Sequence, residues 1–197
     1  MWKHWFKFIK PEKKVLDLRA EKMTSFQEAL KEILKHEGGY VNDPTDMGGE
    51  TNYGITLKTA RDWGYTGSMR DIPMSTVEAI YKKNYWDRNR LDDVAARSYE
   101  IAFEIFDSGV NTGTKRAGTW FQATLNMMNR GGRSWPEIGV DGAVGDKTIL
   151  SFLGAPSKDF GTFVKILKAL RARHYLNIVE AKPSQEKYIR GWINRVL

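Results

Sequence analysis

Residues 33–57 contain the end of an amphipathic helix followed at once by a glycine-rich segment, and this junction constrains the fold more than any other stretch. The apolar residues before the break recur at the spacing of one helix face: Phe26, Leu30, Ile33 and Leu34. A helix is therefore predicted over 25–37. Gly38 and Gly39 can adopt the left-handed backbone that ends a helix, so Glu37 should be its last or next-to-last helical residue.

Glu37 is a candidate general acid because of its place at this junction. A carboxylate at a helix C-terminus faces the negative end of the peptide dipoles, which disfavours its charged form, and burial acts in the same direction. A carboxyl that keeps its proton near neutral pH is what a general acid requires. An ionised partner would come from the turn segment that follows, where the candidates are Asp43, Asp46 and Glu50. The alternative is a solvated helix end followed by ordinary turns.

The run H-E-G-G-Y-V-N-D-P at 36–44, continued by D-M-G-G-E-T-N-Y-G-I-T at 46–56, resembles the signature of glycoside hydrolase family 108. That family contains N-acetylmuramidases, many of them phage endolysins. The resemblance implies that Glu37 is the catalytic acid. It also implies a mainly α, lysozyme-like helical fold with a small β-hairpin beside the active-site cleft, and we expect strands only between about 40 and 56.

Further site residues follow from the same segment. The spacing of Glu37, Asp46 and Thr51 is similar to the Glu, Asp and Thr set of phage lysozymes, which have one more residue before the Thr. Glu37, Asp46 and Thr51 are therefore the catalytic candidates, with the second carboxylate open among Asp46, Asp43 and Glu50. The candidates for substrate binding are Tyr40, Asp43, Tyr53 and Trp63. Trp63 could stack on a sugar or belong to the core.

Length and charge limit the other function classes. A chain of 197 residues suffices for one compact domain, or for a main domain with a small appendage. Its net charge of +7 is concentrated in residues 1–22, and no basic cluster follows residue 23, so nucleic acid is not a predicted partner.

The histidine and cysteine content argues against a zinc site and a disulfide framework. The chain has three histidines, none of which forms a ligand pair, and it has no cysteine. We therefore predict no cofactor and no metal.

The first 22 residues combine lysines with apolar residues at helical spacing, namely Trp2, Trp5, Phe6 and Ile9. This pattern is typical of a segment that contacts an anionic membrane, and the alternatives are an extra packed helix or a leader. Lysines interrupt it too often for a secretory signal. We therefore expect synthesis in a host cytoplasm without Sec export, and action on the cell wall in the periplasm.

Capping patterns predict where several helices begin. Ser25 with Glu28 and Ser75 with Glu78 form capping boxes, and Thr56 can cap a short helix that ends near Trp63. Apolar residues at helical spacing over 92–108 predict the central core helix. Charged residues on or near its opposite side are interpreted as solvated: Glu100, Glu104 and Asp107. The alternative for Asp107 is a cap of the segment that follows.

The C-terminal part resembles a wall-binding unit. Residues 140–148 resemble the turn of small peptidoglycan-binding modules, with Asp146 as the predicted N-cap of the next helix and fold maintenance as the role of the turn. We thus predict three parts: an N-terminal extension over 1–24, a catalytic portion over 25–112 and a helical peptidoglycan-binding portion over 113–197 packed on it.

The leading functional prediction is a monomeric peptidoglycan hydrolase that cleaves the β-1,4 bond between N-acetylmuramic acid and N-acetylglucosamine during phage-induced lysis. A lytic transglycosylase is the nearest alternative, because it also needs one glutamic acid but closes an anhydro ring instead of adding water. A non-catalytic wall-binding or membrane-active protein is the alternative from a different class.

Overall fold

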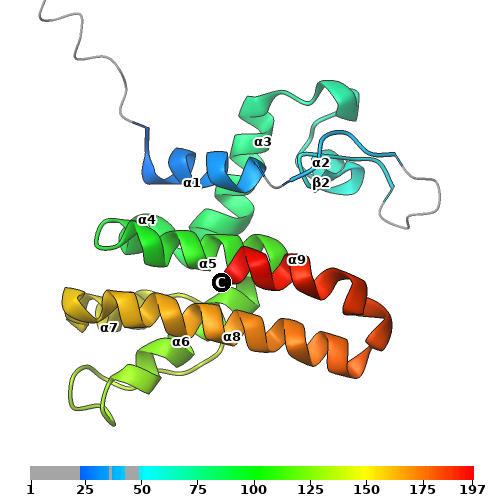
Figure 1. Cartoon of the computed structure of the whole chain (residues 1–197). Coiled ribbons are helices and arrows are strands. Elements are labelled where there is room, and N and C mark those ends of the chain that lie inside the picture. The colour runs from blue at the N-terminus through cyan, green and yellow to red at the C-terminus, as the bar shows by residue number, and fades with distance from the viewer. Residues whose placement is uncertain (1–22, 36, 43–48) are drawn as a thin grey trace, which may run out of the picture.

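Apolar side chains recur at helical spacing along most of the chain, and the structure consists mainly of helices joined by short turns (Figure 1). The structure is a computed structural model that describes residues 23–35, 37–42 and 49–197. The predicted amphipathic segment 1–22 lies outside the described residues. Within the described ranges, no helix has both the length and the apolar character needed to cross a bilayer.

The elements before residue 99 are α1 (Ser25–Leu34), β1 (Thr51–Asn52), β2 (Ile55–Thr56), α2 (Leu57–Asp62), η3 (Met69–Asp71), α3 (Met74–Tyr81), η4 (Lys82–Trp86), η5 (Asp87–Asn89) and α4 (Leu91–Ala95). The elements after it are α5 (Tyr99–Thr112), α6 (Thr114–Met128), α7 (Asp146–Gly154), η6 (Ser157–Asp159), α8 (Phe160–Ala181), η7 (Pro183–Gln185) and α9 (Glu186–Val196). η4 is a π-helical turn that continues α3, and the other η elements are 3-10 turns. The prediction of a mainly α, lysozyme-like fold is confirmed.

The small sheet is the predicted hairpin. β1 and β2 pair antiparallel with Thr51 opposite Thr56 and Asn52 opposite Ile55, and Val41 forms an isolated bridge to Thr51. Its two central residues, Tyr53 and Gly54, both have positive φ, at 51° and 70°. Two such residues make the tight turn whose twist matches paired strands.

The helix starts differ from the predictions by small shifts with clear causes. α1 is capped by Thr24 in a capping box with Gln27, so the prediction of Ser25 with Glu28 is wrong by one residue although its chemistry is right. The capping box of Ser75 with Glu78 is wrong, because α3 begins at Met74 after Pro73 and has no side-chain cap. The Thr56 cap of α2 is confirmed, since its hydroxyl accepts the Thr59 N–H at 3.1 Å.

The predicted helix over 92–108 is two helices, α4 and α5, separated by a break at residues 96–98. Ser98 causes the new start, because it has an extended backbone and its hydroxyl accepts the Ile101 N–H at 3.3 Å. In Figure 1, α5 lies at the centre of the molecule, with α1 on one side and α8 on the other.

One hydrophobic core runs from α1 through α5 to α8, so it includes side chains from both sides of residue 113. Edge-on ring contacts join Phe26, Trp86 and Phe106, with centroids 5.3–6.1 Å apart. A second, smaller cluster lies between α8 and α9 and consists of Ala172, Tyr175 and Val196 with flanking side chains. The C-terminal helices therefore share their core with the rest of the chain.

Two charges predicted as solvated are buried. Glu104 and Asp107 have side chains only 6% exposed, and both approach Arg171 of α8, which is fully buried. The sequence interpretation is wrong for these two because α5 is covered on more than one side, whereas Glu100 in the first turn of the helix is exposed as predicted. Burial raises the pKa of the Glu104 carboxyl, and the nearby Arg171 guanidinium opposes this shift.

Arg171→Met should lower the free energy of unfolding by about 3–5 kcal/mol, because it leaves buried carboxylates facing a thioether. Chemical denaturation at neutral pH measures the effect. Arg173→Met is the matched control, since Arg173 lies on the same helix and is exposed, and its change should stay within about 0.5 kcal/mol. Equal denaturation midpoints for the two variants would contradict this interpretation.

Candidate active site

Glu37 follows α1 rather than ending it. The helix stops at Leu34 with Lys35 as its C-cap, so the prediction that Glu37 is helical is wrong by about two residues. One helix-like bond remains, because the Glu37 N–H donates to the Ile33 carbonyl at 3.2 Å. The Glu37 side chain is 21% exposed. It is thus held at the end of a core helix, mostly shielded but still open to solvent.

The hairpin tip lies directly against this carboxyl. A Cβ added to Gly54 would come within 2.7 Å of Glu37 Oε2 and 3.0 Å of the Tyr81 hydroxyl. A residue with a Cβ would therefore strain the positive φ here and push the Glu37 carboxyl aside. The backbone of the hairpin forms one wall beside Glu37.

Two tyrosines form the adjoining wall. Tyr81 of α3 donates its hydroxyl to the Tyr53 carbonyl at 2.8 Å, which fixes the hairpin tip to the helix. Tyr85 of η4 lies beside it with ring centroids 5.4 Å apart. Burial first, and then the charge of Glu37, raise the pKa of both hydroxyls, so both keep their protons. The tyrosines are therefore neutral hydrogen-bond donors next to a carboxyl.

A positive charge from the C-terminal helix α9 also lies near the Glu37 carboxyl. Arg195 of α9 has Nη2 3.9 Å from Glu37 Oε1. The same guanidinium donates from Nε and Nη2 to Asp107 Oδ1, at 3.2 and 2.6 Å. The neighbourhood of Glu37 thus contains a glycine turn, two neutral hydroxyls and one positive charge.

The other predicted site residues have different surroundings. Thr51 pairs through its backbone with Val41, at 2.8 and 2.9 Å, which places it in the strand next to the tip. The Arg70 guanidinium lies over the Tyr40 ring, 3.9 Å from the ring centroid. Trp63 ends α2 and is 40% exposed. The catalytic and binding roles of these residues stay predictions.

Asp43 and Asp46 lie outside the described residues. Glu50 precedes β1, and its carbonyl accepts the Leu57 N–H at 2.8 Å, which ties the base of the hairpin to α2. The second carboxylate therefore stays a prediction with three candidates.

Sequence reasoning missed four residues around Glu37: Gly54, Tyr81, Tyr85 and Arg195. Gly54 is part of the motif but gives no sign in sequence of which side chain it faces. Tyr81 is buried and Tyr85 is partly buried, as their helical spacing indicates, but that spacing says nothing of the carboxyl. Arg195 is 158 positions away from Glu37 in the numbering, and no local pattern connects the two.

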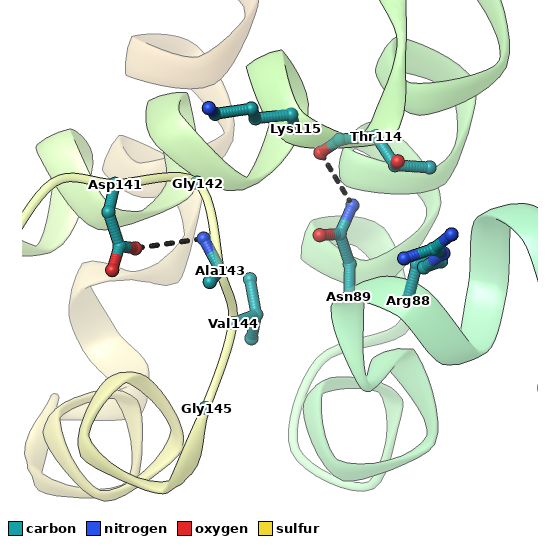
Figure 2. A pocket seen from close by; sticks show the side chains of 9 residues that line it. All are labelled: Arg88, Asn89, Thr114, Lys115, Asp141, Gly142, Ala143, Val144 and Gly145. Atoms are coloured by element: carbon teal, nitrogen blue, oxygen red, sulfur yellow. Dashed lines mark hydrogen bonds between the residues drawn. The ribbon is translucent and has the colours of Figure 1, made fainter.

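A separate hollow lies where η5, the start of α6 and residues 141–145 meet, with a volume of about 470 Å³ (Figure 2). Figure 2 shows Asn89 and Arg88 on one side and the 141–145 loop on the other. The Asp141 carboxylate at its edge accepts from the Ala143 N–H at 2.8 Å and from Gln122 Nε2 at 2.9 Å. The Asp141 carboxylate thus stabilises the 141–145 loop.

The 140–148 turn has the expected structural contacts. Gly142 has φ +81°, and an added Cβ would meet the Lys115 carbonyl at 2.4 Å. The prediction that Asp146 is the N-cap of the next helix is wrong, because Gly145 occupies that position and Asp146 is the first residue of α7. The Asp146 carboxylate instead pairs with Arg90, which links α7 to the segment before α4.

Comparison with known proteins identifies two regions. Residues 30–113 match the model of the family described as glycosyl hydrolase 108, and residues 116–197 match a family described as a predicted peptidoglycan domain. The hydrolase region, residues 30–113, therefore belongs to glycoside hydrolase family 108. The chain is a glycoside hydrolase that acts on peptidoglycan. Glu37 lies in the hydrolase region, whereas Arg195 lies in the peptidoglycan region.

A solved structure supports the same assignment for the whole fold. The chain is similar to SagA of Brucella abortus, with 25% identity and a TM-score of 0.63 over 87% of this chain and 89% of that one. No curated protein matches the sequence. The similarity covers both matched regions, so the chain shares more than its hydrolase region with SagA.

Gly54→Ala should lower peptidoglycan-hydrolysing activity by about tenfold or more, because the new methyl group displaces the Glu37 carboxyl. Gly49→Ala is the matched control. Gly49 also has a positive φ, at 67°, but no atom of the described residues lies within 4 Å of an added Cβ. Both variants share the backbone strain, and only Gly54→Ala adds the collision. Initial rates of hydrolysis of purified peptidoglycan measure the difference, at a temperature where circular dichroism shows that both variants are folded. An equal loss of activity in the two variants would contradict the explanation.

Proposed function

We propose that the chain is an N-acetylmuramidase, which hydrolyses the β-1,4 bond between N-acetylmuramic acid and N-acetylglucosamine, and that Glu37 is its general acid. The observation that carries this proposal is the surrounding of the Glu37 carboxyl: about four-fifths shielded, against the hairpin tip and close to two protonated tyrosine hydroxyls. A group in such a place can reach a bound sugar while bulk water has limited access to it.

The chemistry needs one proton, one water and one negative charge. Glu37 transfers its proton to the glycosidic oxygen as the C1–O bond breaks, and the sugar gains oxocarbenium character. Water then adds to C1 and loses its proton to an ionised carboxylate, for which Asp46 is the first candidate and Asp43 and Glu50 are the others. The Thr51 hydroxyl, in the strand beside the tip, orients that water.

Aromatic side chains offer surfaces for sugar rings. Trp63 is 40% exposed at the end of α2, which leaves ring area free for an apolar sugar face. One face of the Tyr40 ring is covered by Arg70, so Tyr40 would contact substrate with its edge or its other face. The hydroxyl of Tyr53 and the carboxylate of Asp43 are the polar contacts in this proposal.

The biological setting we propose is lysis of a host cell by a phage endolysin. The enzyme would be made in the cytoplasm, act as a monomer on the wall in the periplasm, and contact the anionic membrane surface through residues 1–22. The net charge of +7 supports an anionic partner of this kind.

Glu37→Gln should reduce lysis of outer-membrane-permeabilised Gram-negative cells by about 100-fold or more, because the amide cannot supply the proton. Loss of turbidity measures the rate. Glu28→Gln is the control, since Glu28 is an exposed carboxylate on α1, and its rate should match the wild type. If Glu37→Gln keeps full activity and removal of residues 1–22 abolishes it, the protein acts on membranes and the proposal fails.

Product analysis tests the reaction itself. Mass spectrometry of the released muropeptides should show reducing-end N-acetylmuramic acid, with one water added per bond cleaved. Products that end in 1,6-anhydro sugars would identify a lytic transglycosylase. Reducing-end N-acetylglucosamine would show that the other glycosidic bond is cleaved.

A further inference from the structure

A line of alternating charges leads from the buried core to Glu37. It begins with Glu104, whose Oε1 is 3.4 Å from Arg171 Nη1, and Arg171 also pairs with Asp107 Oδ2. Asp107 Oδ1 then pairs with Arg195 Nη2 at 2.6 Å, and this Nη2 atom is 3.9 Å from Glu37 Oε1. The line runs from α5 to α8, returns to α5 at Asp107 and then reaches α9, which lies beside α5 in Figure 1.

Asp107 anchors Arg195 firmly. Its two oxygens are divided between the two arginines, and Oδ1 also accepts from Asn111 Nδ2 at 3.1 Å. The Asp107 side chain is only 6% exposed, so little water competes for these bonds. Asp107 is thus a fixed anion in the central helix, and it holds the Arg195 guanidinium in one place.

Arg195 acts on Glu37 as a charge rather than as a hydrogen-bond donor. The 3.9 Å between Nη2 and Oε1 is too long for a hydrogen bond but short enough for electrostatic attraction. Both side chains are about one-fifth exposed, at 20% and 21%, so screening by solvent is incomplete. The attraction exists only while Glu37 is ionised.

The other groups that face Glu37 among the described residues do not supply a positive charge. Tyr81 of α3 and Tyr85 of η4 are neutral, because burial and the charge of Glu37 raise the pKa of each hydroxyl. Asp107 of α5 reaches the site only through Arg195, and its negative charge offsets part of the attraction between that guanidinium and Glu37. Arg195 is therefore the cation that responds to the ionisation of Glu37.

We propose that Arg195 is a positioning residue for Glu37: held by Asp107, it stabilises the carboxylate left after proton transfer and sets the pH range in which the acid works. This inference rests on the proposed role of Glu37 as general acid. It also means that the region matched to a peptidoglycan domain supplies part of the catalytic surroundings, because α9 belongs to residues 116–197. The hydrolase region would then be incomplete without its C-terminal partner.

Arg195→Gln should move the alkaline limb of the kcat/KM pH profile to higher pH by about half a unit to one unit. The sign follows from the role of the acid: activity falls as Glu37 loses its proton, and without the cation Glu37 keeps that proton to higher pH. Arg195→Lys retains the charge and should shift the limb by less than half as much. Arg190→Gln is the matched control on the same helix, where the exposed arginine should leave the profile unchanged.

A titration that does not depend on activity separates this inference from the proposed function. Carboxyl-carbon NMR of the full-length protein follows the ionisation of Glu37, with its signal assigned by its loss in Glu37→Gln. Arg195→Gln should move the Glu37 titration upward by the same amount as the kinetic limb. An unchanged titration would overturn the role of Arg195, whatever the activity. A shifted titration in a protein that does not cleave peptidoglycan would support the pair and reject the general-acid role.

Discussion

The carboxylate of Asp107 holds together the parts of the molecule that matter for its chemistry. It is buried in the central helix α5 and is shared by two arginines, one from α8 and one from α9. Neither arginine is near Asp107 in sequence, so these contacts form only when the C-terminal helices pack against α5. Removal of either arginine would leave the charge of this buried carboxylate only partly compensated in a medium of low dielectric constant. The C-terminal helices are thus joined to the rest by charge as well as by the common hydrophobic core.

The groups next to the candidate acid Glu37 are mainly the backbone of the hairpin tip and neutral tyrosine hydroxyls. Gly54 lets the hairpin backbone approach Glu37, and Tyr81 fixes that backbone by binding the Tyr53 carbonyl. Tyr53 itself has a left-handed backbone, at φ 51°, which is uncommon for a residue with a side chain. The hairpin is only two residues long in each strand, so its position depends on these contacts more than on its own ladder.

Much of the fold could be predicted from sequence because its signals are local. Helical spacing and turn residues located the hairpin and most helices, and the motif around Glu37 indicated the family. Charges on α5 were misinterpreted because periodicity shows which residues share a face, but not how many faces are covered. Glu104 and Asp107 are buried by α8, which is far away in sequence. Arg195 was missed for the same reason, since its place beside Glu37 follows from how α9 folds back along α8.

The π-helical turn η4 fixes the chain length beside the site. It contains Tyr85, which lies next to the candidate acid, and ends with Trp86, which is fully buried among Phe26 and Phe106. A π-turn holds one residue more than an α-helical turn would, and losing that residue would rotate everything after it by about 100°. A relative with a one-residue deletion here would have to give up either the tyrosine at the carboxyl or the tryptophan in the core. The spacing of this stretch therefore matters as much as its residue identities for keeping both side chains in place.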